Sequence, residues 1–251
     1  MDLKDKVVLV TGAARGIGHA VALRMAQEGA RVAMAVRSIE AASGAIARVK
    51  AVNSAVFPVE VDLTIGARVE KMVAEVLAQY GTIDVLVNCA FWGPPASLEA
   101  TTEDFWDKTI DSTLKSVYLC ARAVAPTFQA KCAGRIVTIG SLAGKIGEDN
   151  RTAYCAAKWG VEGLTAALRI EMAKYDVHVH LISPAATATP FWTTNNVALE
   201  GQVLERMIPA ETIAEAVVWV LKQPDQVIIP DVPVYNFRNP FEGKSSPFAD
   251  G

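Results

Sequence analysis

The residues best suited to proton transfer are a tyrosine and a lysine four positions apart, Tyr154 and Lys158. Apolar spacing predicts a helix over 152–174, which places both side chains on one face, one turn apart. A free phenol is a weak base at neutral pH, and we expect the neighbouring ammonium group to lower its pKa. Such a pair suits proton exchange with an alcohol or carbonyl oxygen, although taken alone it also fits an ordinary surface helix.

A serine precedes this pair at the end of a predicted strand. Ser141 follows the apolar run 135–139 and stands thirteen residues before Tyr154. Its hydroxyl can donate a hydrogen bond to the oxygen that exchanges the proton, as negative charge develops there. The sequence therefore predicts an acid–base group with a hydrogen-bond donor beside it.

A second feature with chemical meaning is a glycine-rich turn between the first predicted strand and the first predicted helix. Gly12 permits a tight turn, while Gly16 and Gly18 leave room where backbone must approach a pyrophosphate or pack on the sheet. A helix beginning at this point, near Ile17, offers unpaired N–H groups and a partial positive charge to phosphate. The spacing differs from the common GxGxxG fingerprint, so a turn without a ligand is the competing interpretation.

These residues are spaced along a regular alternation of strands and helices. Such an order predicts right-handed βαβ units and an α/β fold with a doubly wound parallel sheet and helices on both faces. We predict one domain over 1–251, with an irregular substrate lid at 189–209 and an extended tail at 230–251. Predicted strands are 7–10, 31–36, 56–61, 85–88, 135–139, 177–182 and 227–229; predicted helices are 16–28, 39–51, 67–80, 152–174, 213–222 and one within 103–130, with a possible break near Pro126.

The glycine turn from Thr11 to Gly18, Asp62-Leu63 after the third strand, Ser141, and Tyr154 with Lys158 together resemble the short-chain dehydrogenase/reductase family. The resemblance covers about residues 5–225, and the combination in this order is far more specific than any single piece. It implies a Rossmann-type fold, a nicotinamide cofactor, and a homodimer or homotetramer paired through the helices of Thr113 and Tyr154. It also implies that the cofactor lies against Asp62, Leu63, Asn88, Ala90, Tyr154, Lys158, Pro184, Thr187 and Thr189.

The end of the second strand indicates which nicotinamide cofactor to expect. An acid at this place would bind the ribose 2′-hydroxyl and repel a 2′-phosphate, but the sequence has Val36 followed by Arg37. Arg37, together with Arg15 in the glycine turn, can bind a 2′-phosphate through guanidinium donors. We therefore predict NADP(H) in preference to NAD(H).

The sequence departs from the family pattern at three places. Thr113 aligns with the family's fourth catalytic residue, an asparagine that helps a water-mediated proton relay through its backbone carbonyl, so Thr113 is predicted to be catalytic with reduced relay efficiency. Phe91 replaces a glycine after the fourth strand and adds bulk near the nicotinamide. Ala185 replaces the glycine of a Pro-Gly pair after the sixth strand, although Thr189-Pro190 keeps the family's loop pattern.

The loops beyond the strand ends are rich in aromatic residues. Because ligands bind at this edge of an open α/β sheet, we predict a substrate with an apolar or ring portion. The competing interpretation is that these side chains only pack the lid. The aromatic residues of the tail are expected to cover a pocket or a neighbouring subunit; they are Tyr235, Phe237, Phe241 and Phe248. The predicted substrate residues are Trp92, Leu142, Phe191 and Trp192.

Composition excludes several other classes of protein. A net charge of −3 provides no basic surface for nucleic acid, and no apolar run is long enough for a membrane span. The four cysteines form no metal-binding or disulfide pattern and are expected to be reduced, buried thiols. His178 and His180 share a strand face without further ligands, so no metal is predicted. Without a signal peptide, the predicted location is the cytoplasm.

The sequence thus predicts an NADP(H)-dependent oxidoreductase that interconverts a ketone or aldehyde and a secondary or primary alcohol by hydride transfer. Two alternatives remain. One is a lyase or epimerase of the same family that keeps its nucleotide bound. The other is a nucleotide-binding regulatory protein with weakened catalysis, which the changes at Thr113 and Ala185 would fit.

Overall fold

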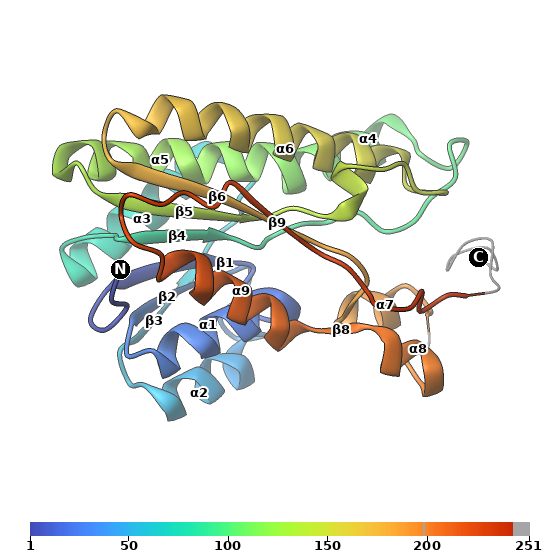
Figure 1. The fold of residues 1–251 in the computed structure, drawn as a ribbon, viewed down its shortest axis with the longest axis horizontal. Coiled ribbons are helices and arrows are strands. Elements are labelled where there is room, and N and C mark those ends of the chain that lie inside the picture. Colours follow the sequence, from blue (N-terminus) through green and yellow to red (C-terminus); the bar gives the residue numbers. More distant parts are fainter. Residues whose placement is uncertain (198, 243–251) are drawn as a thin grey trace.

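The computed structural model describes residues 1–197 and 199–242, and seven strands within them form one parallel sheet (Figure 1). The strand order is β3-β2-β1-β4-β5-β6-β9, so the chain first winds outward from β1 and then returns to continue on its other side from β4. The predicted Rossmann-type α/β fold with a doubly wound parallel sheet is confirmed. The strands are β1 Val7–Thr11, β2 Arg31–Val36, β3 Val56–Glu60, β4 Val85–Asn88, β5 Gly134–Ile139, β6 Val177–Pro184 and β9 Asp231–Val234.

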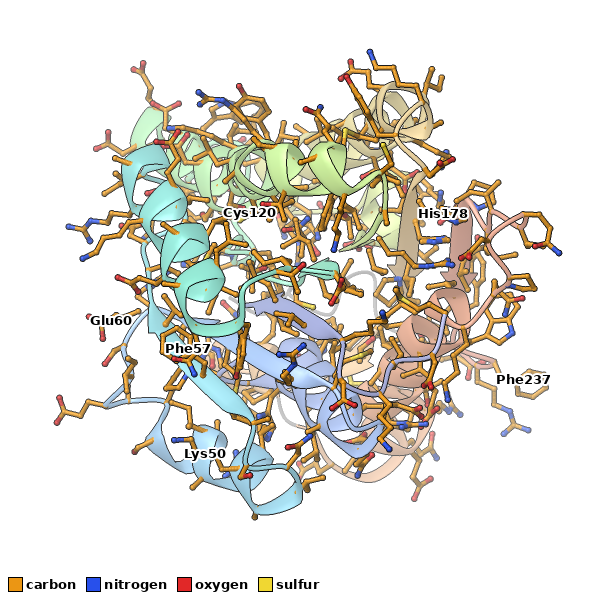
Figure 2. The ribbon with its side chains drawn as sticks, turned by 90° about the vertical axis from the view of Figure 1, so that its left-hand side faces the viewer. Lys50, Phe57, Glu60, Cys120, His178 and Phe237 are labelled. Carbon is orange, nitrogen blue, oxygen red and sulfur yellow. The ribbon has the colours of Figure 1, made fainter. Side chains whose placement is uncertain are left out.

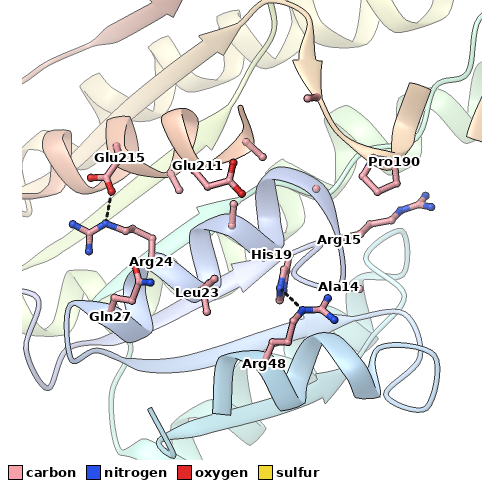
Figure 3. A pocket seen from close by; sticks show the side chains of 15 residues that line it. Ala14, Arg15, His19, Leu23, Arg24, Gln27, Arg48, Pro190, Glu211 and Glu215 are labelled. Atoms are coloured by element: carbon pink, nitrogen blue, oxygen red, sulfur yellow. Dashed lines mark hydrogen bonds and ion pairs between the residues drawn. The ribbon is translucent and has the colours of Figure 1, made fainter. Parts of the chain in front are cut away.

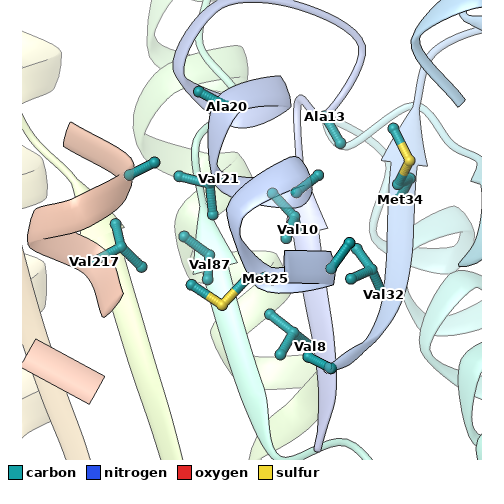
Figure 4. Close-up of a cluster of buried hydrophobic side chains, with 14 of the residues drawn as sticks. Val8, Val10, Ala13, Ala20, Val21, Met25, Val32, Met34, Val87 and Val217 are labelled. Atoms are coloured by element: carbon teal, nitrogen blue, oxygen red, sulfur yellow. The ribbon is translucent and has the colours of Figure 1, made fainter. Parts of the chain in front are cut away.

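Helices cover both faces of the sheet, as Figure 1 shows. Those in contact with one core are α1 Gly16–Gln27, α2 Ser43–Val52 and α9 Ala210–Leu221, and those on the opposite core are α3 Gly66–Tyr80, α5 Ser116–Lys131 and α6 Thr152–Ala173. Successive residues of β1 alternate between the two cores. Val8 and Val10 pack with Met25 of α1 and Val217 of α9 (Figure 4), whereas Leu9 faces the other side. Burial on both faces explains why β1 is an unbroken apolar run.

The amphipathic helix α3 shows how local sequence fixes an element. Val69, Met72, Val73 and Val76 recur at helical spacing and are all buried against the sheet. The helix ends where Gly81 adopts a left-handed conformation, with φ of 77°, and donates its N–H to the carbonyl of Leu77. The helix and its end were both predicted to within one residue.

Two predicted elements were placed wrongly. The helical stretch 103–130 is interrupted by a π-helical turn, η1 Asp111–Lys115, between α4 Glu103–Ile110 and α5, and α5 continues through Pro126. The last strand is β9 and not 227–229. Among the described strands β9 pairs with β6 alone, so it lies at the edge of the sheet, and an edge strand tolerates the missing N–H of Pro233.

The region 189–209 is more ordered than predicted. It contains α7 Pro190–Thr194, α8 Gly201–Arg206 and the short strand β8 Ile208–Pro209, which pairs with β7 Thr187–Ala188. Figure 1 shows this lid beyond the ends of the sheet strands. Trp192, Met207 and Phe241 form a small core of its own.

The tail is likewise not a simple extended segment. It begins with β9, and the ring of Phe241 then packs against that of Trp192 at a tilt, with ring centroids 5.1 Å apart. The Asn236 side chain donates to the carbonyls of Ala186 and Arg206, both at 2.9 Å, so the tail covers the lid of its own chain. Phe237 is 97% exposed and projects from the edge of the molecule (Figure 2). Phe248 and the rest of 243–251 lie outside the described residues, so the single-domain boundary stays a prediction.

The expectation of reduced, buried thiols holds for the cysteines only in part. The four cysteines are free, and burial raises the pKa of the Cys120 thiol to about 12, but Cys132 is exposed. The rings of His178 and His180 lie 6.1 Å apart. Within 1–197 and 199–242, no three His, Cys, Asp or Glu residues are grouped as metal ligands would be. No helix in the same ranges is both long and apolar enough to cross a membrane.

Candidate active site

Ser141, Tyr154 and Lys158 are brought together where β5 ends and α6 begins. Ser141 precedes the short helix η2 Leu142–Gly144, and its hydroxyl accepts a hydrogen bond from the N–H of Ala143 at 3.1 Å. Ser141 also hydrogen-bonds the phenol of Tyr154. The Lys158 ammonium group donates to the carbonyl of Ile139 at 2.9 Å, and its nitrogen lies 5.7 Å from the centre of the Tyr154 ring. The predicted grouping of these side chains is therefore present in the fold.

Burial dominates the ionisation of both groups. Tyr154 is 8% exposed, and desolvation raises its pKa, which is opposite to the expected lowering by Lys158. Arg151 and the hydrogen bond from Ser141 oppose this shift only in part. Burial also lowers the pKa of Lys158 to about 8, so its charge is reduced at mildly alkaline pH. The predicted lowering of the Tyr154 pKa was wrong because it considered the charge of Lys158 and not the removal of the phenol from water.

Thr113 occupies the π-helical turn η1 and is 1% exposed. Its hydroxyl donates to the carbonyl of Trp92 at 2.8 Å and accepts from the N–H of the same residue at 3.3 Å. The Thr113 hydroxyl thus links the π-helical turn to the loop after β4, acting as a hydrogen-bond donor and as an acceptor. Gly93, the next residue of that loop, packs so closely on Tyr154 that an added Cβ would lie 2.8 Å from its ring. The side chain of Thr113 therefore helps to fix the surroundings of Tyr154.

Aromatic rings and a guanidinium group enclose Tyr154. The Phe91 ring centroid is 5.8 Å from that of Tyr154 and 5.6 Å from that of Phe191 on α7. Arg151 Cζ lies 3.9 Å from the Tyr154 ring centroid and 5.3 Å from that of Phe191. The sequence placed Phe91 near the site, but no role was predicted for Arg151. The position of Arg151, three residues before Tyr154, could have indicated that the two side chains are close.

The predicted substrate residues divide into two groups. Leu142 is buried next to Ser141, and Phe191 contacts the rings around Tyr154. The ring of Trp92 packs on α4 instead, with Phe105 at 5.0 Å and the Lys108 nitrogen at 4.1 Å. Trp192 is 9% exposed and donates its indole N–H to Thr187 O, so it belongs to the core of the lid. The expected aromatic rim is therefore narrower than the sequence suggested.

The glycine turn has the geometry that a pyrophosphate requires. An added Cβ would lie 2.9 Å from Ala90 Cα at Gly12 and 2.3 Å from Gly12 O at Gly18, and Gly12 and Gly16 both have positive φ. Helix α1 begins at Gly16, and the side chain of its N-cap residue, Arg15, makes no capping hydrogen bond to the first N–H groups, which suits a site for phosphate. Ile17 turns its side chain toward the core and leaves this face to the backbone.

The loops that face this turn supply the other predicted cofactor residues. Asn88 is buried, and its side-chain oxygen has no hydrogen-bond partner among the described residues, as expected of a group that receives a ligand. The hydroxyl of Thr11 accepts from the N–H groups of Cys89 and Ala90, which joins the ends of β1 and β4. On the lid side, an added Cβ at Gly16 would lie 3.3 Å from the Thr189 side chain. Pro184 is the last residue of β6, and Thr187 begins β7 just before the lid. These residues therefore fit a nicotinamide dinucleotide.

The end of β2 is less simple than its sequence. Arg37 is exposed, and its charge helps to lower the pKa of Asp62, which is held mainly by hydrogen bonds from Thr64. Leu63, beside Asp62, is half-buried against the core. A carboxylate that sequence reasoning did not consider is also present, because Glu60 at the end of β3 pairs in register with Val36 and accepts the N–H of Ile39 at 2.9 Å.

A pocket of about 390 Å³ opens on the outer side of the glycine turn, between α1 and α9 (Figure 3). Arg15 lines it together with His19 and Arg48, whose side chains lie 3.3 Å apart. Tyr154 is not among its lining residues. This pocket is thus positively charged on one side and lies apart from the proton-transfer group, which the rings of Phe91 and Phe191 cover.

Comparison with known proteins agrees with this geometry. Residues 6–199 match the short chain dehydrogenase family. The chain is 34% identical to the 3-oxoacyl-[acyl-carrier-protein] reductase of Staphylococcus epidermidis, over 84% of this chain and 86% of the relative. It is also 34% identical to the NAD-dependent glycerol dehydrogenase of Listeria innocua, over 83% and 81% of the two chains. The chain belongs to the short-chain dehydrogenase/reductase family of oxidoreductases.

A solved structure shows the same fold over nearly the whole length. The crystal structure of a metagenomic short-chain oxidoreductase in complex with NADP superposes with a TM-score of 0.81 and 32% identity, covering 95% of this chain and all of the other. The relatives thus include one described as NAD-dependent and one that binds NADP. The choice between the two cofactors therefore has to be argued from residues of this chain.

Proposed function

We propose that the protein is an NADP(H)-dependent oxidoreductase that interconverts a ketone or aldehyde and the corresponding alcohol, with Tyr154 as the acid–base group. The observation that carries the proposal is the convergence of Ser141, Tyr154 and Lys158 at the strand ends. The glycine turn opens on the same edge of the sheet, where Gly12 approaches Ala90. A proton-transfer group and a dinucleotide cradle at one edge support a hydride-transfer enzyme.

The nicotinamide, when bound, supplies or accepts the hydride, and the chain's own residues handle the oxygen and its proton. In the direction of carbonyl reduction, Tyr154 donates its phenolic proton to the substrate oxygen. Ser141 donates a hydrogen bond that stabilises the negative charge developing on that oxygen. Lys158 places positive charge near the resulting phenolate, while Phe91 and Phe191 keep water away from it.

The preference for NADP(H) rests on the balance of charge around the adenosine end. Arg37 and Arg15 are exposed and free to turn toward a 2′-phosphate, and Arg48 lines the same pocket as Arg15. Glu60 opposes them, but its carboxylate is engaged by the N–H of Ile39. The nearby Asp62 carboxylate is likewise engaged by hydrogen bonds from Thr64, so the guanidinium groups are the ones available to a phosphate, which favours the phosphorylated cofactor.

Cofactor titration tests this preference first. We expect NADPH, followed by its fluorescence, to bind at least about tenfold more tightly than NADH, a difference of about 1.4 kcal/mol. Arg37→Met should remove most of this difference without weakening NADH. Arg122→Met, which removes an exposed arginine from α5, is the matched control and should change neither affinity. Tighter binding of NADH would refute the NADP(H) assignment, and binding of neither would refute the oxidoreductase.

The Tyr154→Phe variant separates the enzyme from the alternatives. A reductase should lose nearly all turnover of ketones and aldehydes with NADPH and keep its affinity for the cofactor, because the aromatic ring remains and only the proton-donating hydroxyl is lost. A binding protein with regulatory function would show no change. Neither the substrate class nor a cytoplasmic location is tested by the fold, and both stay predictions.

Exposed apolar residues on α5 and α6 support a homo-oligomer. Tyr118 is 46% exposed, Trp159 is 54% exposed and Ile170 is 80% exposed. Large apolar side chains at such exposure commonly mark a surface that a partner covers. We expect light scattering to show a dimer or a tetramer, and Trp159→Lys to weaken it; a monomer at micromolar concentration would contradict this part of the proposal.

A further inference from the structure

Arg151 lies immediately before α6, and its guanidinium group is stacked on the ring of Tyr154. Arg151 Cζ is 3.9 Å from the centroid of that ring, and the arginine is only 5% exposed. The ring of Phe191 lies 5.3 Å away from the same atom. A guanidinium at this distance from a ring is held by cation–π attraction, which strengthens when water is excluded.

The main chain of Arg151 is fixed by neighbouring segments. It forms a bridge with Ala96 of the loop after β4, where the N–H of Ala96 donates to Asn150 O at 2.8 Å. Its carbonyl accepts the N–H of Cys155 at 2.7 Å in the first turn of α6. The position of the guanidinium over Tyr154 is therefore set by elements that belong to the framework of the site.

We propose that Arg151 is a positioning residue that acts through Tyr154, holding the ring in place and favouring its phenolate form. The inference rests on the proposed acid–base role of Tyr154. The phenol oxygen belongs to the ring whose centroid lies 3.9 Å from Arg151 Cζ. An opposite charge this close, within about 4–6 Å, favours the ionised form of a titrating group. Lys158 is more distant, at 5.7 Å from the ring centroid, and its nitrogen is bonded to Ile139 O.

Other groups around the phenol have effects of both signs. Burial raises the pKa of Tyr154 most strongly, and Arg151 is the largest influence that lowers it, ahead of the hydrogen bond from Ser141. Glu148 and Cys155 raise it further. The charged and titratable groups near the ring, within the described part of the chain, are Glu148 in the loop before α6 and Arg151, Cys155 and Lys158 at α6. Ser141 after β5 adds a neutral hydrogen-bonding hydroxyl.

Titration of the phenolate absorbance tests the proposal without a substrate. Subtracting the titration of the matching Tyr154→Phe protein isolates Tyr154 from the other tyrosines. Arg151→Met keeps an apolar stem of similar length and removes the charge, and Arg151→Gln is a second neutral variant in case the first fails to fold. We expect both to move the midpoint of Tyr154 upward by at least about one pH unit, equivalent to a tenfold loss of phenolate at a given pH.

Matched proteins make the outcome decisive. Arg122→Met removes an arginine that is 60% exposed on its side chain, far from this ring in sequence, and should leave the midpoint unchanged. Arg151→Lys keeps a charge without the planar stack and should give a smaller shift than Arg151→Met. Coincident titrations of the parent and the neutral variants, across the pH range in which circular dichroism shows them folded, overturn the proposal.

Activity supplies the second readout and separates two failures. For oxidation of 1-phenylethanol with NADP⁺, kcat should reach its plateau at higher pH in Arg151→Met than in the parent. Retention of turnover by Tyr154→Phe would overturn the proposed function, whereas the phenolate titration would still decide what Arg151 does. Loss of turnover in Tyr154→Phe with no shift in Arg151→Met overturns the role of Arg151 alone.

Discussion

Replacing Thr113 by valine is expected to loosen the loop that packs on Tyr154. Valine has nearly the shape of threonine, so the change removes the hydroxyl and leaves packing almost intact. Two hydrogen bonds disappear, to the carbonyl of Trp92 at 2.8 Å and from its N–H at 3.3 Å. At a net 0.5–1.5 kcal/mol for each bond, the loss is about 1–3 kcal/mol of unfolding free energy. The midpoint of that range corresponds to a decrease in Tm of about 4–8 °C for a chain of this size.

The catalytic effect should be distinct from the loss of stability. Gly93 follows Trp92 and contacts the ring of Tyr154, so a freer loop allows the phenol to leave the geometry for proton transfer. We expect kcat of Thr113→Val to fall about tenfold, which is about 1.4 kcal/mol of activation free energy, with little change in the affinity for NADPH.

The assay compares Thr113→Val with Thr113→Ser by urea unfolding and by steady-state reduction of a ketone. Serine keeps the hydroxyl and loses one buried methyl group, so it should cost about 1 kcal/mol in stability and retain most of kcat. A valine variant as stable as the parent would refute the two hydrogen bonds as a stabilising clamp. A serine variant that loses more kcat than the valine variant would refute the link between the hydroxyl and Tyr154.

Three further predictions follow from buried groups and close contacts. Lys158→Met should abolish turnover and yet raise the free energy of unfolding of the cofactor-free protein, measured in urea below pH 8, by up to about 3 kcal/mol. The reason is that folding lowers the pKa of Lys158 from 10.5 to about 8, so the charged side chain destabilises the parent. The difference in stability between variant and parent should vanish as pH rises toward 10.5. Burial lowers the pKa of His180 to about 4 in the folded protein. Its protonation should therefore reduce the free energy of unfolding by up to about 3 kcal/mol as pH falls from 6.5 to 4. Equal acid sensitivity of the parent and of a His180→Gln protein would contradict this. Gly18→Ala should weaken NADPH binding at least tenfold, since its Cβ would lie 2.3 Å from Gly12 O, whereas Gly163→Ala, with nothing within 4 Å, should keep the affinity and raise Tm slightly.

The sheet and its helices were predictable because their signals are local. Buried parallel strands such as 31–36 and 85–88 are short apolar runs bounded by turn residues, and their predicted bounds match β2 and β4. The break in the helix around 103–130 was not predictable from Pro126, which α5 accommodates. The interruption occurs at Asp111–Lys115, where the Thr113 hydroxyl donates a hydrogen bond to the carbonyl of Trp92. A contact between segments this far apart in the chain leaves no mark on the spacing of apolar residues, so it could not be predicted.

The candidate site shows the same division. Spacing alone placed Tyr154 and Lys158 on one helix face, and the position after a strand located Ser141. Electrostatics could not be predicted this way, because the sequence shows which charges are near and not how much water is lost. Burial therefore reversed the expected shift in the pKa of Tyr154, and the influence of Arg151 emerged only from the stacked geometry.

The departures from the family pattern at Phe91 and Thr113 act on the same segment. Phe91 covers Tyr154, and the next residue, Trp92, is held by the hydroxyl of Thr113. A bulky ring beside the phenol can keep water out only if its backbone is held in place, and the clamp at Trp92 provides this. Arg151 stacks on the same phenol and also lies 5.3 Å from the ring of Phe191 in the lid. The exclusion of water raises the pKa of Tyr154, and the guanidinium group of Arg151 offsets part of that rise. Phe91, Thr113 and Arg151 therefore act together on one pKa, and replacing any of them should alter the pH at which the phenol exchanges its proton.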